Sequence, residues 1–484
     1  MKNRRKTSEG RSENMLGALI PYAHWLSSGD NTWQMTAGVL VGLMSIPGIA
    51  VLYGGLVQKK WAVNTMFMAF TGFALVLVCW VLFSYKMGFG TSWTGAGHGI
   101  LHNFIGKPGT VLSHEGLQSQ ANILLVLGTG LMPPFRFPMS SLVWFQFVFA
   151  GITPLLFLGS VLGRMSPKAW LLFVPLWSTF VYTVNAFLLW GGGYWAQKGA
   201  LDYSGGYVIH LAAGTSGFVA AAVIGPRLKR DRTHAIPNNL LLVAVGAGII
   251  WLGWSGFNGG DPYFAGADAA AAVLNTNLCT ATALLTWVIL DMVASPMKKP
   301  TFLGAINGMI VGLVGITPAA GFVNGLGAIC IGVIDCTIVF FAWYYLSKIR
   351  PFNKVDDALG VVYTHGIAGF FGGILTGVFA DPSMIEYLGT GKTPAVSASG
   401  LLFGHPWQVM IQLFAALTII AYDGIMTFIL IKIVGLITPL RLPDEVLEVG
   451  DTAIHDEEVM PSEMLGRMSN ASSAYDEPGM EVAR

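Results

Sequence analysis

The most regular feature of the sequence is a series of apolar segments, about twenty residues each, that follow one another with short polar connections. An α-helix rises about 1.5 Å per residue, so such a segment crosses the roughly 30 Å hydrocarbon core of a bilayer. Continuous apolar runs exclude a β-barrel, whose strands alternate apolar and polar residues. The pattern predicts an all-α membrane protein with about eleven transmembrane helices. They are expected at about 34–58, 62–88, 139–163, 168–190, 203–225, 237–259, 268–293, 302–321, 324–347, 358–380 and 407–438.

The same pattern divides the chain into three regions. Residues 1–33 are predicted to be an extracellular N-terminal segment and residues 34–440 the transmembrane domain. Residues 441–484 are polar and acidic and are expected to form a cytosolic tail with a mobile end. Residues 91–138 are too polar and glycine-rich to span a membrane, and their short apolar piece 121–133 is expected at the interface or partly buried in this loop.

Basic residues in the short connections favour one orientation. The positive-inside rule places the more basic side in the cytoplasm, which puts the N-terminus outside and the C-terminus inside. The basic N-terminal segment argues for the opposite orientation, but five separate connections agree and decide the prediction. The expected cytoplasmic residues are Lys59, Lys60, Arg164, Lys168, Arg227, Lys229, Arg230, Arg232, Lys298, Lys299, Lys348, Arg350 and Lys354, against Lys86, Lys107, Arg136, Lys198 and Lys392 outside.

Two patterns recur in the second half of the chain. Gly-Ile-Thr-Pro at 151–154 returns at 315–318, and an aspartate with a histidine eight positions later occurs at 202–210 and at 357–365. In both copies of the second pattern, glycines follow the histidine at four and seven positions, on the same helix face. Both matches are displaced by five spans, and an odd displacement inverts the second copy. The sequence therefore predicts a five-plus-five inverted repeat with an eleventh helix added.

The histidines of this repeat, His210 and His365, are the main candidate functional residues. Each lies about 12 Å from the end at which its span starts, so both approach the midplane of a core about 30 Å thick. The glycine faces permit close helix contact, and we infer that the two imidazoles meet. Burial with bonds to backbone carbonyls is the structural alternative, and two ligands alone make a poor metal site. Because intramembrane ionisable groups are costly and usually functional, we favour a pair that shares one proton and lines a transport path.

Several residues near the expected outer end have two explanations each. Asp202, like Asp357, suits a helix N-cap, and it could also make the entrance favourable to cations. Trp190 suits either an aromatic belt at the membrane interface or a cation–π wall for a small cation. On periodicity alone, Phe149 and Phe257 are core or lipid-facing residues.

Composition agrees with a membrane protein and narrows the range of partners. The 484 residues are 54% hydrophobic and 11% charged, and a net charge of +1 gives no indication of nucleic-acid binding. We predict no removable signal peptide and no cofactor. The cysteines lie in apolar runs and are interpreted as small core residues rather than disulfide partners or metal ligands. They are Cys79, Cys279, Cys330 and Cys336.

These residues and their neighbours give the chain a resemblance to the Amt/Mep/Rh ammonium transporter family. The resemblance covers about residues 33–455, and Gly-Gly-Asp-Pro at 259–262 looks closest to the second group of plant ammonium transporters. The motifs that carry it are Ile46–Gly48 through Tyr53–Gly55, Gln146 through Phe149–Thr153, Trp190–Gly193, Asp202 through His210, Trp254 with Gly256–Asn258, and His365–Gly366.

The resemblance implies a fold, an assembly and a substrate. It implies the eleven-helix ammonium transporter bundle in the plasma membrane, as a homotrimer with one pore in each subunit. It implies a transporter rather than an enzyme, with high-affinity-type uptake of ammonium and with methylammonium as a further substrate.

The resemblance also implies roles for particular residues. Phe149 and Phe257 would stack as a gate at which the substrate loses its proton. This implied role replaces the interpretation of both residues as core or lipid-facing. His210 and His365 would line the apolar pore that follows. The substrate-binding residues implied are Phe149, Trp190, Asp202, Trp254 and Asp261.

Two positions depart from the family pattern. Asp261 stands where the family often has a serine, so an extra carboxylate lies near the implied cation site. Many plant relatives carry a regulatory threonine two residues before the tail histidine, whereas here Ala453 precedes His455 at that distance and Thr452 lies one earlier. The first departure bears on affinity, and the second makes the usual phosphorylation switch doubtful.

Two other functions were weighed against transport. An ammonium sensor would use the same outer site and signal through the cytosolic tail. An intramembrane histidine metalloenzyme would need several clustered histidines, and those outside the pair are scattered in loops and tails. The sequence favours transport.

Overall fold

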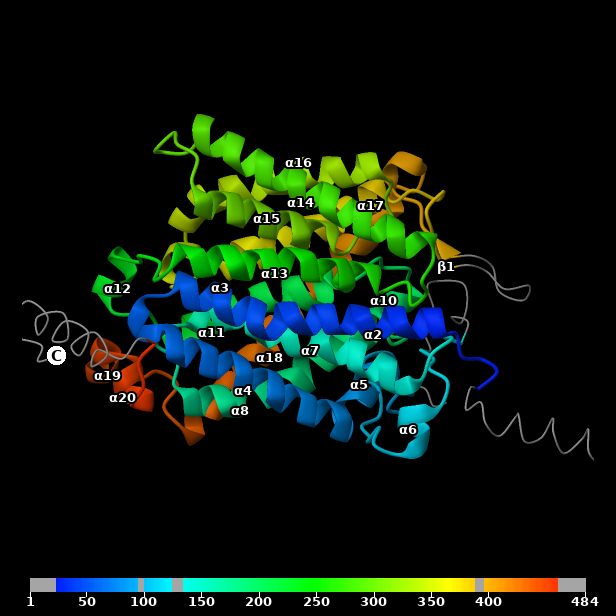
Figure 1. Cartoon of the computed structure of the whole chain (residues 1–484), viewed down its shortest axis with the longest axis horizontal. Helices are drawn as coiled ribbons and strands as arrows, with labels where there is room; N and C mark the ends of the chain where they lie inside the picture. Colours follow the sequence, from blue (N-terminus) through cyan, green and yellow to red (C-terminus); the bar gives the residue numbers. More distant parts are fainter. Residues whose placement is uncertain (1–22, 95–99, 124–133, 388–395, 460–484) are drawn as a thin grey trace, which may run out of the picture.

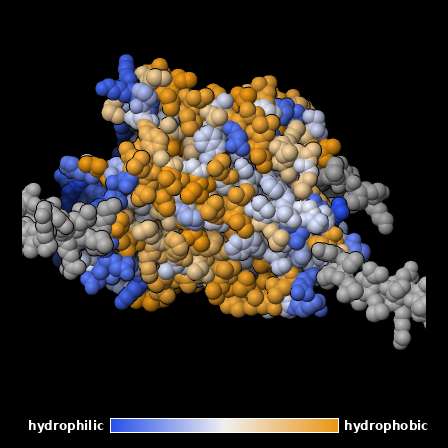
Figure 2. All heavy atoms as spheres, in the orientation of Figure 1, coloured by the Kyte–Doolittle hydropathy of each residue, from blue (hydrophilic) through white to orange (hydrophobic). Residues whose placement is uncertain are grey.

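The structure, a computed structural model, describes residues 23–94, 100–123, 134–387 and 396–459. The helices run side by side in one bundle, and short elements lie at its two ends (Figure 1). On the face shown in Figure 2, hydrophobic residues form a belt across the middle of the bundle, and hydrophilic residues gather towards its ends. A belt of this kind is suited to the hydrocarbon core of a bilayer.

The spans follow the predicted order, and several of them combine α-helix with one π-helical turn. In chain order they are α2 (Ser28–Leu43), η1 (Met44–Gly48) and α3 (Ile49–Leu56); α4 (Ala62–Cys79), η3 (Trp80–Ser84) and α5 (Tyr85–Phe89); α7 (Met139–Val161); α8 (Pro167–Trp177), η5 (Ser178–Tyr182) and α9 (Thr183–Leu189); η6 (Gly206–Leu211) and α11 (Ala212–Ile224); α13 (Leu240–Gly259); α14 (Ala267–Val293); α15 (Phe302–Ile316); α16 (Gly325–Tyr344); η9 (Val362–Ile367) and α17 (Ala368–Phe379); and α18 (Trp407–Ile437).

Short elements connect the spans and follow the last one. They are η2 (Lys59–Trp61), η4 (Ile100–Asn103), α6 (His114–Gln118), α10 (Tyr194–Gln197), α12 (Lys229–Thr233), η7 (Leu346–Lys348), η8 (Phe352–Lys354), the antiparallel strands β1 (Ile385–Tyr387) and β2 (Val396–Ser397), η10 (Leu401–Phe403), α19 (Asp444–Val449) and α20 (Asp451–His455).

The number of spans agrees with the prediction, and two boundaries differ from it by five residues or more. Among the described residues, 10 helices are long and apolar enough to cross a membrane, and Phe302–Ile316 is a shorter apolar helix. The first span begins at Ser28, earlier than the predicted 34, because the Ser27 hydroxyl caps it by accepting the Asp30 amide. The eighth span ends at Ile316, since Pro318 disfavours helical continuation, and turns replace the predicted helix as far as 321. Most of the predicted interfacial piece 121–133 lies outside the described residues.

The two ends of the chain's helical part lie at opposite ends of the bundle. α2 begins at one end, and α19 and α20 lie at the other (Figure 1). This arrangement is what an odd number of spans requires. The assignment of the cytosolic end stays a prediction from the basic residues.

The predicted repeat has a similar local structure in both copies, with the capped amides one position closer to the aspartate in the second. The carboxylate of Asp202 accepts the amides of Tyr207 and Val208 at 3.1 and 3.0 Å. The carboxylate of Asp357 accepts the amides of the residues at 361 and 362 at 3.2 and 2.8 Å. The histidine of each copy lies in the π-helical turn that follows, η6 or η9. Both aspartates therefore act as helix caps, as predicted, and π-helical turns of this kind are frequent at functional sites.

Glycines let the two copies approach backbone to backbone. A Cβ atom at Gly214 would lie 2.1 Å from Cα of Gly366, and one at Gly369 would lie 2.6 Å from the carbonyl oxygen of Gly206. Neither position has room for a side chain. These contacts confirm the role predicted for the glycine faces and hold α11 against η9 and α17 against η6.

The cysteines follow the core prediction only in part. All four are unpaired; Cys279 and Cys336 are buried, whereas Cys79 and Cys330 are half-buried. Cys79 and Cys330 lie in apolar runs that face both the outside of the bundle and its core. Hydrophobic periodicity alone therefore could not assign these two cysteines to the core or to the outside.

The described part of the predicted tail packs against the start of α4. The carboxylate of Asp451 accepts the amides of Val63 and Asn64 at 2.8 and 3.0 Å, and His455 Nε2 lies 3.0 Å from the side-chain oxygen of Asn64. Leu447 is fully buried. Asp451 thus satisfies amides at a helix N-terminus, which have no partner within the helix.

Docking of the tail is expected to depend on pH through two opposing groups. Burial raises the pKa of Asp451 to about 6, and burial lowers the pKa of His455. Because the docked Asp451 holds a proton more readily, its contribution to docking is full below the ordinary carboxyl pKa of about 4 and is lost as the pH rises through the docked value. His455 acts oppositely, since its contribution is lost as the pH falls through its docked pKa.

Variants can separate the two groups. A spin label on a cysteine at position 448 should become more mobile from about pH 5 to about pH 7 in His455→Asn, where Asp451 alone titrates in this contact, and less mobile over that range in Asp451→Asn. The same trend in both variants would contradict this account of the tail.

Candidate functional site

Two histidines meet in the centre of the bundle. Nδ1 of His210 lies 3.2 Å from Nδ1 of His365, and the rings are 5.3 Å apart at 21°. His210 is fully buried and His365 is 5% exposed. A hydrogen bond between the two Nδ1 atoms needs one donor and one acceptor, so the pair holds one proton between them. The predicted meeting of the imidazoles is confirmed.

Trp254 continues the pair towards the expected outer end. Its ring stacks on His210 with centroids 5.3 Å apart at 16°, and its Nε1 donates to the hydroxyl of Thr317 at 2.9 Å. Thr317 belongs to the second Gly-Ile-Thr-Pro motif, so the repeat fixes the orientation of this ring. Phe257, one turn of α13 further on, lies 4.8 Å from Trp254 and 6.0 Å from His210 between centroids.

The phenylalanines implied as a gate are in contact. Phe149 from α7 and Phe257 from α13 are 4.3 Å apart between centroids at 30°, and both are fully buried. Trp190 stands edge-on to Phe149 at 6.3 Å, and its Nε1 donates to the backbone carbonyl of Asp202 at 2.7 Å. Six aromatic and imidazole rings from five spans therefore form one row from Trp190 to the histidine pair.

Asp202 lies beside this row and is not an exposed entrance charge. It is 5% exposed, one carboxylate oxygen caps η6, and Oδ1 has no hydrogen-bond partner among the described residues. Its backbone carbonyl holds Trp190. The aspartate therefore positions the aromatic site through both its main chain and its side chain.

The structure adds two residues that sequence reasoning missed, Ser204 and Tyr182, and bonds Ser204 to the predicted Asp261. Asp261 is buried and bonded to the Ser204 hydroxyl, and the same hydroxyl lies 2.9 Å from the carbonyl oxygen of Phe257. The hydroxyl of Tyr182 is buried without a partner in the described part of the chain. The position of Ser204, two residues after Asp202, was the only signal in the sequence.

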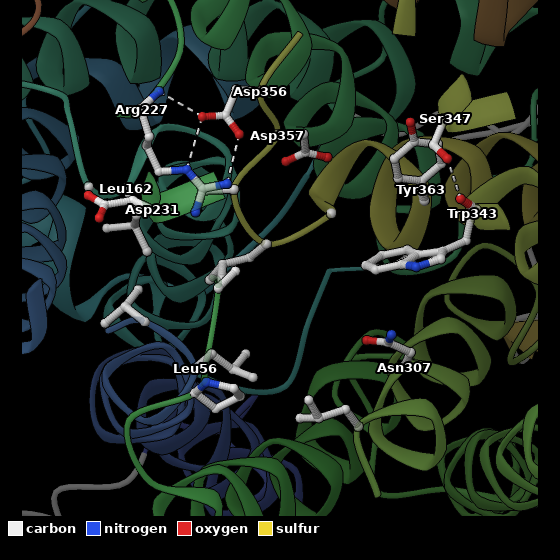
Figure 3. Close-up of a pocket in the computed structure, with 18 of the residues that line it drawn as sticks. Leu56, Leu162, Arg227, Asp231, Asn307, Trp343, Ser347, Asp356, Asp357 and Tyr363 are labelled. Atoms are coloured by element: carbon white, nitrogen blue, oxygen red, sulfur yellow. Dashed lines mark hydrogen bonds and ion pairs between the residues drawn. The ribbon is translucent and has the colours of Figure 1, made fainter. Parts of the chain in front are cut away.

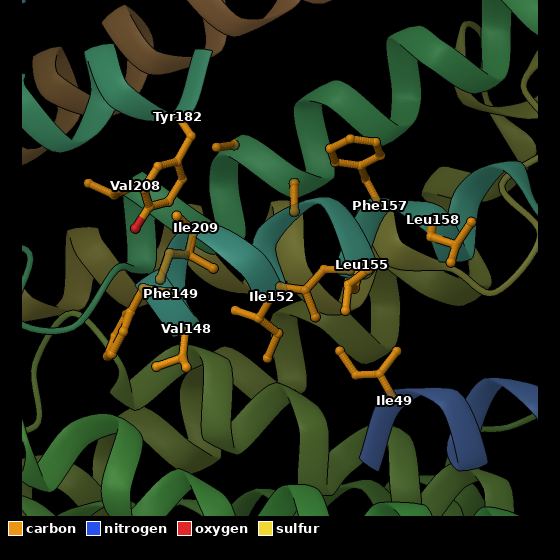
Figure 4. Packing of buried hydrophobic residues seen from close by; sticks show 14 of the residues in the cluster. Ile49, Val148, Phe149, Ile152, Leu155, Phe157, Leu158, Tyr182, Val208 and Ile209 are labelled. Atoms are coloured by element: carbon orange, nitrogen blue, oxygen red, sulfur yellow. The ribbon is translucent and has the colours of Figure 1, made fainter. Parts of the chain in front are cut away.

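An apolar path leads from the histidines to the opposite end. A cavity of about 20 Å³ and one of about 40 Å³ both touch His365, and they share Leu52, Tyr53 and Ile310. Aliphatic side chains from α3 and α7, including Ile49 and Ile152, pack along it (Figure 4). The Tyr53 hydroxyl donates to the carbonyl of Leu156, so it adds no unsatisfied polar group to this wall.

The path opens into a wide vestibule of about 840 Å³. It shares Leu56, Asn307 and Leu359 with the 40 Å³ cavity. Arg227 and Asp356 form a two-bond ion pair on one side, with Trp343, Tyr363 and Asn307 on the other (Figure 3). Although burial opposes it, the Arg227 guanidinium holds the pKa of Asp356 below its usual range, so this carboxylate stays ionised at neutral pH. The vestibule lies at the end predicted to be cytosolic.

Among the described residues, no group of three or more His, Cys, Asp or Glu side chains is placed to hold a metal ion. The only close histidine pair of that part of the chain faces apolar side chains and aromatic rings. The site therefore consists of buried aromatic rings with two acids, Asp202 and Asp261, followed by an apolar passage with small cavities.

Comparison with known proteins agrees with the family resemblance of the sequence. The family model described as Ammonium Transporter Family matches residues 32–460. The chain belongs to the ammonium transporter family. It is 46% identical over 459 residues to ammonium transporter 3 member 1 of Oryza sativa subsp. japonica, covering 91% of this chain and 89% of that one. It is 47% identical over 451 residues to ammonium transporter 2 of Arabidopsis thaliana, covering 92% and 91%.

Solved structures of the family have the same architecture. The crystal structure of Saccharomyces cerevisiae Mep2 aligns with a TM-score of 0.74 at 30% identity, over 87% of this chain and 91% of that one. A structure titled Sensor Amt Protein aligns with a TM-score of 0.73 at 21% identity, which shows a common fold only. This ammonium transporter family member is thus a multi-pass helical membrane protein, as its sequence predicted.

Proposed function

We propose that this family member takes up ammonium with high affinity across the plasma membrane by deprotonating it at the outer aromatic site. The observation that carries the proposal is the continuous row of rings that joins Trp190 to His365 and ends at an apolar passage. Ammonium would bind at Trp190 and Phe149, beside the buried carboxylates of Asp202 and Asp261, with Trp254 at the inner side of the site. Ammonia would then pass the histidine pair.

The physical reason for deprotonation is the cost of charge. An ion at the centre of a bilayer costs several kcal/mol or more, whereas neutral ammonia avoids most of that cost. The aliphatic walls around Ile49, Leu52 and Ile310 offer no compensating charge. The histidine pair supplies a polar strip in this apolar path. Potassium cannot be deprotonated, so the same step excludes it.

The remaining partners follow from the family. We propose a homotrimer with one path in each subunit, embedded in lipid, and methylammonium as a second substrate. Parallel recording of current and labelled methylammonium uptake, on the full chain in proteoliposomes, tests the function and reports the charge moved per substrate. Absence of uptake, with protein correctly inserted, would refute it.

Trp190 provides a direct test of recognition. Trp190→Leu removes the ring that faces Phe149, and we expect the apparent KM for methylammonium to rise about threefold or more, as the loss of a cation–π contact predicts. Trp195→Leu is the matched control, because this tryptophan packs against Tyr194 at the same end of the bundle. An equal change in both variants would count against the proposed role.

The second candidate, an ammonium sensor, draws on the contact between the tail and α4. If the protein senses rather than transports, ammonium should change the mobility of residues 444–455 in protein that shows no flux. Flux without that change favours the transporter.

A further inference from the structure

The Asp261 carboxyl group is part of a hydrogen-bond chain that ends on a gate residue. Asp261 follows the end of α13 and is 3% exposed. It contacts the Ser204 hydroxyl, and Ser204 Oγ lies 2.9 Å from the carbonyl oxygen of Phe257. That carbonyl belongs to the last turn of α13, where carbonyl groups lack partners within the helix.

The Ser204 hydroxyl has one proton and two acceptors within reach. If Asp261 is ionised, Ser204 donates to the carboxylate, and the Phe257 carbonyl loses this donor. If Asp261 is protonated, the acid donates to Ser204 Oγ, and the hydroxyl donates to the Phe257 carbonyl. Only the protonated state gives every group of this hydrogen-bond chain a partner. The protonation of Asp261 therefore decides whether the backbone carbonyl of Phe257 accepts a hydrogen bond.

Other polar groups near Asp261 are suited to the transfer of a proton. Oδ1 of Asp202 and the hydroxyl of Tyr182 are buried and have no hydrogen-bond partner in the described part of the chain. The carboxylates of Asp261 and Asp202 both lie close enough to act electrostatically on the Tyr182 hydroxyl. In Figure 4 this hydroxyl points to the side of η5 on which Phe149 lies. Two unsatisfied polar atoms thus share the neighbourhood of two acids and the gate.

We propose that Asp261 accepts the proton that ammonium loses at the gate, a role that rests on the proposed function. An N–H bond of ammonium breaks and leaves its electron pair on nitrogen, and an O–H bond forms on the carboxylate. Ammonium and carboxylate become ammonia and carboxylic acid, so the total charge stays zero. Ser204 then transfers its hydrogen bond from Asp261 to Phe257. The acid returns its proton to water before the next cycle.

The experiment measures labelled methylammonium uptake by the full chain in proteoliposomes, as a function of concentration and outer pH. Asp261→Asn should lower the maximum rate at least about tenfold, as loss of a proton acceptor does, and flatten the pH profile. The KM should change less than the maximum rate, because Trp190 and Phe149, the rings proposed to bind the cation, stay in place. Ser204→Ala, a change in a positioning residue, should lower the rate less and shift the pH profile, and Asp261→Glu should restore part of the rate.

A control and a second measurement separate the alternatives. Asp268→Asn removes a nearby carboxylate at the start of α14 and should change neither rate nor pH profile. Infrared difference spectra on addition of methylammonium should show a new carboxylic acid C=O band in the unaltered protein and none in Asp261→Asn.

Three results would overturn the proposal. A higher KM at unchanged maximum rate in Asp261→Asn, larger at low ionic strength, would make the carboxylate an attractor of cations only. Unchanged kinetics in that variant would leave Asp261 as a turn residue before Pro262. Absence of the infrared band in the unaltered protein would exclude protonation of Asp261. Absence of uptake by the unaltered protein would instead refute the proposed function.

Discussion

His210→Ala and His365→Ala are each expected to lower ammonium uptake at least about tenfold, a change of about 1.4 kcal/mol in the transport barrier. Either change removes the 3.2 Å bond between the two Nδ1 atoms and leaves the other imidazole buried without its partner. A buried polar group without a partner costs about 1–3 kcal/mol, and here it would lie beside the apolar path. The measurement is labelled methylammonium uptake at equal surface expression.

A surface histidine provides the control for this prediction. His234 lies exposed in the connection before α13, so His234→Ala should leave uptake unchanged. Because the bundle buries a large core around the pair, we expect each pore variant to keep its assembly and to unfold as one species. Normal uptake and selectivity in both pore variants would show that the pair is a structural contact.

Asp202→Ala is expected to abolish most activity, because Asp202 has two roles. Its carboxylate caps η6 through Tyr207 and Val208, and loss of a cap costs about 1 kcal/mol. The same segment presents the backbone carbonyl that orients Trp190, so movement of the cap displaces the aromatic site. Asp202→Asn separates the roles. Both amides bond to one carboxylate oxygen, which the asparagine side chain can replace, so this variant should keep the cap and lose only the charge.

Asp357 is the matched control within the same chain. It also caps its π-helical turn, η9, but each of its carboxylate oxygens accepts one amide, and the aromatic row does not pass it. If capping alone matters, Asp202→Asn should keep uptake at least as well as Asp357→Asn, in which one of the two capped amides loses its acceptor. A loss of uptake in Asp202→Asn alone would assign the charge of Asp202 to the substrate, and activity of Asp202→Ala equal to that of the unaltered protein would exclude both roles.

The sequence by itself determined the membrane class, the span count and the meeting of the histidines. Hydropathy over about twenty residues is a local quantity, and the lipid core imposes one length on every span, so these features follow from local pattern. The pairing of His210 with His365 followed because an inverted repeat places equivalent residues at equivalent depths. The caps at Asp202 and Asp357 followed because a cap and its amides are close in sequence. The early start at Ser28 and the end at Ile316 were missed, since the cap and turn there are weaker signals than hydropathy.

Only the tertiary structure decided the contacts between distant side chains. Periodicity does not distinguish Phe149 and Phe257 from a lipid-facing phenylalanine. The reason is that hydropathy depends on the residue type and not on the side chain that the residue contacts. Ser204 and Asp261 are 57 residues apart, and nothing in either local sequence marks the other. The helices lie close enough for these contacts because glycines such as Gly214 and Gly369 bring backbone against backbone. Which side chains then face each other depends on the rotation of each helix, which packing fixes and a single span does not encode.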